Sequence, residues 1–183
     1  IEAVVSTWEF DDNDTSGRRK GRLESWFSED IQALYSVVTK YPIETWDLLM
    51  PHIERLTQLE NHDDPRLNKW RDDDFDRNET DIARGVVELL ILAGQTIATE
   101  DPNNLEVRIN SLEKSNSLVA QEIIISVYAY LPASHADKGI NWILDVQQRF
   151  RLGSGYKEPE WMPAFRLIKN LSPHCSEKLF RQL

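Results

Sequence analysis

The sequence predicts an all-α fold in which helices are stacked in pairs. Residues 118–131 are apolar nearly all round, with only Gln121, Glu122 and Ser126 plainly polar, so a helix here must be covered on several sides. Residues 135–150 carry a single apolar stripe, which is typical of an outer helix with one face in water. Its members are Ala136, Ile140, Ile143 and Leu144. An inner helix, a short turn at Pro132 and an outer helix together form the unit of an α-solenoid.

The first part of the chain divides into a lead-in over 1–27 and a helical segment over 28–60. Residues 1–10 are apolar and β-branched, but no second strand-like segment is present to pair with them. Ser28 is an N-cap candidate for the first helix, and Pro42 ends that helix and can begin the next. Pro51 lies inside the second helix, so we expect a kink there or a division into two helices.

Residues 61–78 form the segment of most unusual composition, and we expect an acidic loop. Such a long stretch without secondary structure is uncommon in a compact domain. Leu67, Trp70 and Phe75 are the side chains that could anchor it to the helices beneath.

A helical stack is predicted over 79–183. The helix expected at 79–98 is a second one with few polar positions, and Asp101 followed by Pro102 is a favourable start for the next. Asn116 or Ser117 then begins the inner helix.

Three further helix starts are predicted in this stack. Ser134 and Asp137 have the spacing of a capping box, with Asp in the place of the preferred Glu. Pro159 and Ser172-Pro173 mark the starts of the last two helices. The sum is about eight helices without a fixed repeat period, which predicts degenerate HEAT-like or TPR-like units in a right-handed α–α superhelix.

Composition narrows the class of protein. A chain of 183 residues with 40% hydrophobic and 28% charged residues fits one globular domain. The formal net charge of −10 argues against a nucleic-acid surface and fits either solubility or a basic partner. A single cysteine, Cys175, fits a reducing, cytoplasmic compartment. We see neither a signal peptide nor a run long enough for a membrane span. A start at Ile1 and an end at Leu183 inside an apparent helix indicate a fragment of a longer chain.

The residue patterns that predict catalytic sites are incomplete or missing in this sequence. His174 and Cys175 are adjacent, so their side chains point in different directions, and we interpret Cys175 as a packed small hydrophobe. The sequence contains neither a nucleophile elbow nor a phosphate-binding loop, and we expect no cofactor. One enzymatic alternative is an all-α metal-dependent hydrolase using His52, His62, Asp63 and a helix carboxylate.

Two segments partly match calcium-binding loops. Asp12, Asp14 and Ser16 have the spacing of an EF-hand, but Leu23 stands where the bidentate acid is needed. In the second segment, which holds Asp72, Asp74 and Asp76, an arginine stands where glycine is required. We interpret both as solvated acidic loops, with a loose cation site in the second as the alternative.

The six tryptophans divide into core and surface candidates. Trp46, Trp142 and Trp161 share helical spacing with other apolar residues, which predicts packing between helices. Trp70 is the best candidate for an exposed recognition aromatic, its alternative being a loop anchor. The candidate binding residues are Asp63, Asp64, Trp70, Asp72, Asp73, Asp74 and Asp76.

Four segments of the last third of the chain carry a family resemblance. They are Leu131-Pro-Ala-Ser-His-Ala-Asp137, Asn141-Trp-Ile-Leu144, Arg149-Phe-Arg-Leu-Gly-Ser-Gly155 and Ser172-Pro-His-Cys-Ser176. These segments resemble the helical-repeat region of very large bacterial STAND-type ATPases of antiphage defence. Such proteins join an effector, a P-loop ATPase and a long α-helical sensor. The resemblance implies a sensor or scaffold arm. It carries over no functional residue, because the ATPase motifs are absent from this sequence.

The function expected from the sequence is that of a non-catalytic interaction or scaffold domain. Its partner would be another protein or another part of its own chain, with a basic surface that complements the acidic loop. A purely structural spacer differs from this expectation only in lacking a partner. The metal-dependent hydrolase stands as the enzymatic alternative.

Overall fold

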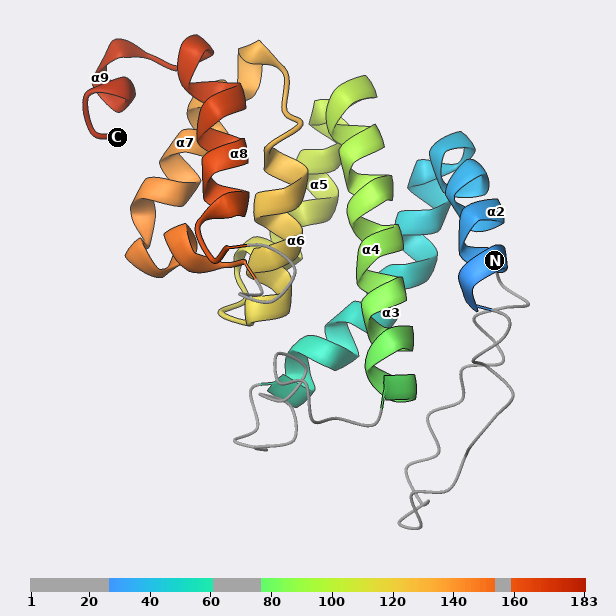
Figure 1. Ribbon diagram of the computed structural model, residues 1–183. Helices are drawn as coiled ribbons and strands as arrows, with labels where there is room; N and C mark the ends of the chain where they lie inside the picture. The colour runs from blue at the N-terminus through green and yellow to red at the C-terminus, as the bar shows by residue number, and fades with distance from the viewer. Residues whose placement is uncertain (1–26, 61–76, 154–158) are drawn as a thin grey trace.

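The computed structural model describes residues 27–60, 77–153 and 159–183 (Figure 1). Within these ranges the chain is all-helical, with eight α-helices, three short 3-10 turns and no strand. The prediction of an all-α fold is therefore confirmed for the described residues. The α-helices are α2 (Phe27–Lys40), α3 (Pro42–Glu60), α4 (Arg77–Glu100), α5 (Pro102–Glu113), α6 (Leu118–Tyr128), α7 (Ala136–Asp145), α8 (Met162–Leu171) and α9 (Glu177–Phe180). The 3-10 turns are η2 (Ala133–His135), η3 (Gln147–Arg151) and η4 (Ser172–His174).

Helices α4 and α6 lie at the centre of the fold. α4 packs against α2, α3, α5 and α6, and α6 packs against α3, α4, α5, α7 and α8. Ile123, Ile124 and Ile125 are three successive residues of α6, and all three are fully buried. Since successive residues of a helix point in different directions, this burial requires neighbours on several sides. The sequence prediction of an inner helix here is confirmed.

The contacts between helices follow the order of the chain. α2 contacts α4, α4 contacts α6, and α6 contacts α8, while each of α3, α5 and α7 packs against the helices that precede and follow it. Figure 1 shows α2, α4, α6 and α8 following one another across the molecule. The buried apolar side chains of these elements form one connected core.

Helices α3 and α4 each contain a residue that is unfavourable in a helix interior, Pro51 and Gly94 respectively. Pro51 lies on the exposed side of α3 and does not divide it, because α3 is one helix from Pro42 to Glu60. Of the two outcomes predicted at Pro51, a kink or a division into two helices, the division is therefore wrong. Gly94 of α4 lies where an added Cβ would be 2.6 Å from both Trp46 and Val127. The absence of a side chain at Gly94 thus lets α3 and α6 approach α4 closely.

The two predicted helix caps at α5 and α6 are present. The Asp101 carboxylate accepts a hydrogen bond from the backbone N–H of Asn104 at 3.2 Å. The Ser117 hydroxyl accepts one from the N–H of Ala120 at 3.3 Å. Each cap satisfies a donor that the first turn of the helix leaves without a partner.

The predicted outer helix is shorter than expected. α7 ends at Asp145 because Val146 has an extended backbone, with φ −138° and ψ 116°, and the chain continues as η3. The capping box predicted at Ser134 and Asp137 is wrong, since no side chain caps α7. Asp137 instead accepts a hydrogen bond from the backbone N–H of Ser176 at 2.6 Å. That bond ties the C-terminal segment to α7.

The last helices also differ from their predicted starts. α8 begins at Met162, three residues after Pro159, and the N–H of Gly153 bonds the carbonyl of Glu160 at 2.8 Å just before it. The helix predicted from Ser172 is interrupted, because Cys175 is extended between η4 and α9. Among the helices described, none is both long and apolar enough to cross a membrane.

Candidate functional site

The binding residues predicted from the sequence lie outside the described residues. They are Asp63, Asp64, Trp70, Asp72, Asp73, Asp74 and Asp76, and the description of the chain passes from Glu60 at the end of α3 to Arg77 at the start of α4. The EF-hand-like residues Asp12, Asp14 and Ser16 also lie outside it. These assignments therefore stay predictions.

Of the three residues named for the alternative of a metal-dependent hydrolase, only one lies in the described part of the chain. His52 is half-buried on α3, whereas His62 and Asp63 fall outside the described ranges. Over 27–60, 77–153 and 159–183, no group of three or more His, Cys, Asp or Glu residues could hold a metal ion. The alternative stays a prediction, and metal analysis of the purified protein would test it.

Cys175 has the environment of a packed side chain. It is half-buried against the hydrophobic core, and its Sγ donates to the carbonyl of Ser172 at 3.3 Å. His174 beside it is exposed. This is the environment expected of a small hydrophobic residue.

A polar cluster joins α5, α6 and α7. The hydroxyl of the buried Tyr128 donates a hydrogen bond to the Glu113 carboxylate. Lys138 of α7 lies 5.7 Å from the centre of the Tyr128 ring and forms an ion pair with Glu106 at 3.1 Å. Burial raises the pKa of Tyr128 well above its ordinary value of 10.0, and the hydrogen bond and charge of Glu113 raise it further. The phenol is thus held neutral, as a link between helices.

Arg149 contacts Trp142, which packs against Tyr128 of this cluster. Its guanidinium lies 4.2 Å from the centre of the Trp142 ring and donates to the Trp142 carbonyl. Burial lowers the pKa of Arg149, while the nearby Asp145 carboxylate, 3.9 Å away, favours the charged form. Trp142 is itself buried, as the sequence predicted, and meets Tyr128 edge-on at 5.8 Å. These contacts hold η3 against α7.

A surface groove lies between α3 and α5. Arg108 of α5 spans it with two hydrogen bonds to the Asp47 carboxylate of α3, at 3.0 and 2.9 Å. Its cavity has a volume of about 280 Å³. The lining residues are Trp46, Asp47, Met50, Pro51, Glu54, Arg108 and Ser111. The groove therefore combines an apolar floor with carboxylates at its rim.

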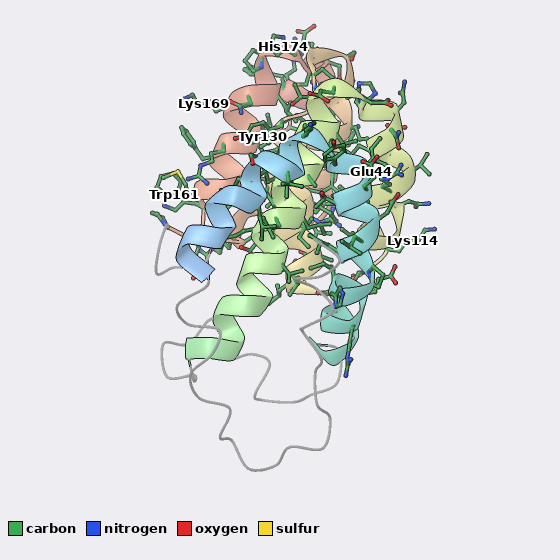
Figure 2. The ribbon with its side chains drawn as sticks, turned by 90° about the vertical axis from the view of Figure 1, so that its right-hand side faces the viewer. Glu44, Lys114, Tyr130, Trp161, Lys169 and His174 are labelled. Atoms are coloured by element: carbon green, nitrogen blue, oxygen red, sulfur yellow. The ribbon has the colours of Figure 1, made fainter. Side chains whose placement is uncertain are left out.

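The outer face of α8 carries a row of large exposed side chains. Trp161 and Phe165 are 53% and 50% exposed, and their rings meet edge-on at 5.8 Å. Lys169 is exposed one further turn along the helix. Figure 2 shows Trp161 and Lys169 projecting on the same side of the molecule. We call Trp161, Phe165 and Lys169 the α8 row.

The sequence interpretation of the tryptophans was right for two and wrong for one. Trp46 and Trp142 are buried, whereas Trp161 is exposed. The inward face of α8 is formed by Pro163, Ala164, Leu167 and Leu171. Trp161 and Phe165 stand four residues apart on the opposite side, and this spacing beside Lys169 was the signal that could have identified the α8 row.

Comparison of the chain with protein-family models, with curated proteins and with solved structures finds no match in any of the three. The α3–α5 groove and the α8 row are thus surface features found from the geometry alone. Both combine apolar side chains with charge, which is the chemistry of macromolecular interfaces.

Proposed function

We propose that this chain is a non-catalytic helical-repeat domain that binds a protein partner or another part of its own chain. Its helical pairs would form a right-handed α–α superhelix of the HEAT or TPR kind. The observation that carries this proposal is the succession of contacts from α2 to α4, α6 and α8, with α3, α5 and α7 between them. Such stacking is typical of solenoids, which use their extended surfaces for recognition.

One contact departs from strict stacking. α3 also reaches α6 beside Gly94, so a helix of the first pair touches a helix of the third. In a regular solenoid each repeat meets only its neighbours. The units proposed here are accordingly degenerate, as the missing sequence period also indicates.

The binding segment in this proposal is the acidic stretch 61–78. Its candidate residues are Asp63, Asp64, Trp70, Asp72, Asp73, Asp74 and Asp76, and their charge calls for a partner with a basic surface. The chain's formal net charge of −10 favours the same kind of partner.

A charge-neutralised variant tests this proposal. A partner is captured with the immobilised chain, purified, and titrated against the wild type by isothermal calorimetry. Changing Asp72, Asp73, Asp74 and Asp76 to Asn should weaken binding by about tenfold or more, because several charge pairs are lost together.

The matched control neutralises four exposed acids elsewhere, with Glu100→Gln, Asp145→Asn, Glu160→Gln and Glu177→Gln. It should bind within about twofold of the wild type, since scattered surface pairs contribute little. Equal binding by both variants would remove the acidic segment from the proposal. If no purified protein binds the wild-type chain, the proposed role in interaction is refuted.

The resemblance extends the proposal to a setting. We place the chain in a sensor or scaffold arm of a large cytoplasmic bacterial ATPase of antiviral defence, with no cofactor, nucleic acid or membrane bound by this part. The resembling segments include the α6–α7 connection and most of α7. A P-loop motif in the same reading frame would support this setting, and a parent protein without one would contradict it.

A further inference from the structure

The α8 row is a surface with a defined chemistry. α8 contains no acidic residue, and Lys169 has no ion-pair partner among the described residues. Residues 159–183 hold four Lys or Arg and two Glu, so their formal net charge is +2. The remaining 158 residues have a net charge of −12, which gives the total of −10. An aromatic pair beside an unpaired lysine fits an apolar surface edged by carboxylates.

The outward side of α3 is such a surface. Met50 and Pro51 form the apolar part of the α3–α5 groove, and Glu44, Asp47 and Glu54 lie along the same helix. Asp47 is occupied by Arg108 at 2.9 Å, whereas Glu44 has no ion pair within the described residues. The groove is an open surface depression of about 280 Å³, so an indole ring can lie across its apolar floor.

The two surfaces match in length. Trp161 and Lys169 are eight residues apart, which is about 12 Å along a helix, and Pro51 and Glu44 are seven apart, which is about 10 Å. With α8 laid antiparallel to α3, Trp161 would enter the groove beside Pro51 while Lys169 reached Glu44. Phe165 would then cover the stretch between them.

The two surfaces cannot meet within one molecule. Figure 2 shows Trp161 and Lys169 on one side of the molecule and Glu44 on the other. We infer that the α8 row of one copy docks into the α3–α5 groove of a second copy. The contact uses different surfaces on the two copies, so it is head-to-tail and can continue into rings or chains. The inference names one partner of the proposed interaction domain and rests on that proposal.

Sedimentation equilibrium of the purified chain at about 0.15 M salt tests the inference, because that salt concentration screens the repulsion between two copies with a net charge of −10 each. We expect concentration-dependent association. Trp161→Ser should weaken association by about tenfold or more, and Lys169→Glu by about fivefold. Lys178→Glu is the matched control, since Lys178 is exposed near the same end of the chain and should leave association unchanged.

Charge exchange separates this contact from a general charge effect. Glu44→Lys should weaken association as Lys169→Glu does, and the chain carrying both changes should associate like the wild type. A mixture of the Trp161→Ser chain with the Glu44→Lys chain should give one-to-one pairs only, because each copy keeps one intact surface.

Three results would overturn the inference. They are a wild type that stays monomeric at about 1 mM, a doubly exchanged chain that associates no better than the single variants, and a Lys178→Glu chain that loses association equally. Binding of the basic partner through residues 61–78 is measured separately, so a monomeric chain that still binds it would leave the proposed function standing.

Discussion

Helices α6 and α8 have 11 and 10 residues, and they show two ways of using a short helix. α6 has seven buried residues spread around its axis and five helical neighbours. α8 buries Pro163, Ala164, Leu167 and Leu171 on one side and leaves Phe165 exposed on the other, beside Trp161 at its N-cap. The number of covered faces, rather than apolar content alone, separates a helix at the centre of the fold from one that keeps an apolar face exposed.

The largest effect is expected from a charge in α6. Ile124→Asp should abolish folding, because it removes about 1.5–3 kcal/mol of side-chain burial and leaves a buried carboxylate that costs several more. Ile124 is only 1% exposed, and typical domains have only about 5–15 kcal/mol of stability. Circular dichroism during heating would show no cooperative transition.

The control is Gln148→Asp on the exposed surface of η3. It should melt within a few degrees of the wild type. Similar mild effects from both variants would contradict the assignment of α6 as the inner helix.

The next effect concerns the crossing of α3, α4 and α6. Gly94→Ala gains about 1 kcal/mol in helix propensity but places a methyl group 2.6 Å from both Trp46 and Val127. Overpacking of this kind costs about 1–3 kcal/mol, so urea denaturation should show a net loss of stability. Adding Val127→Ala should recover part of it. A Gly94→Ala chain more stable than the wild type would show that the crossing has room to spare.

Tyr128 gives a pH-dependent prediction for the α5–α6–α7 cluster. Its raised pKa means that the folded protein keeps the phenol proton after the unfolded chain has lost it, above the ordinary value of 10.0. The stabilisation is therefore fully present below pH 10 and declines as the pH rises beyond it.

Tyr128→Phe should cost about 1–2 kcal/mol at neutral pH, because the hydrogen bond to the Glu113 carboxylate is lost. Above pH 10 the free energy of unfolding of the variant should fall less steeply with pH than that of the wild type. The two slopes should differ by about 1.4 kcal/mol per pH unit, because the variant releases one fewer proton on unfolding. Urea titrations at several pH values measure both quantities. Parallel pH dependences in the two proteins would contradict the assigned environment of Tyr128.

The smallest effect is expected on the outer side of α8. Phe165→Ser should change the free energy of unfolding by no more than about 0.5 kcal/mol, because Phe165 is 50% exposed and its ring meets that of Trp161, which is itself exposed. Leu167→Ala on the inward side of the same helix is the comparison. It should lower the free energy of unfolding by about 2–5 kcal/mol, because it truncates a fully buried side chain. Similar losses at both positions would mean that the α8 row is part of the core.

Much of the fold could be predicted from local patterns. The inner helix α6 follows from its apolar composition, and Asp101 and Ser117 cap the helices that their positions indicated. Features set by distant contacts could not be predicted in this way. The Asp137 carboxylate binds the N–H of Ser176, 39 residues away, so the apparent capping box with Ser134 never forms.

The surfaces were harder to predict than the helices. Trp161 has helical spacing with apolar neighbours, but spacing alone does not say which of two apolar faces is covered. The α3–α5 groove depends on the pairing of Asp47 with Arg108, residues that are 61 positions apart. Composition did indicate the acidic segment, whose binding role stays a prediction because its candidate residues, from Asp63 to Asp76, lie outside the described residues.

Gly94 also has a consequence for how this sequence can change over evolutionary time. Trp46, Gly94 and Val127 lie on three different helices, yet a side chain at 94 would occupy space that the other two now fill. A larger residue at 94 therefore fits the fold only beside smaller side chains at both 46 and 127. In a set of related sequences these three positions should covary, and their joint substitution pattern would reveal the α3–α4–α6 crossing without a structure.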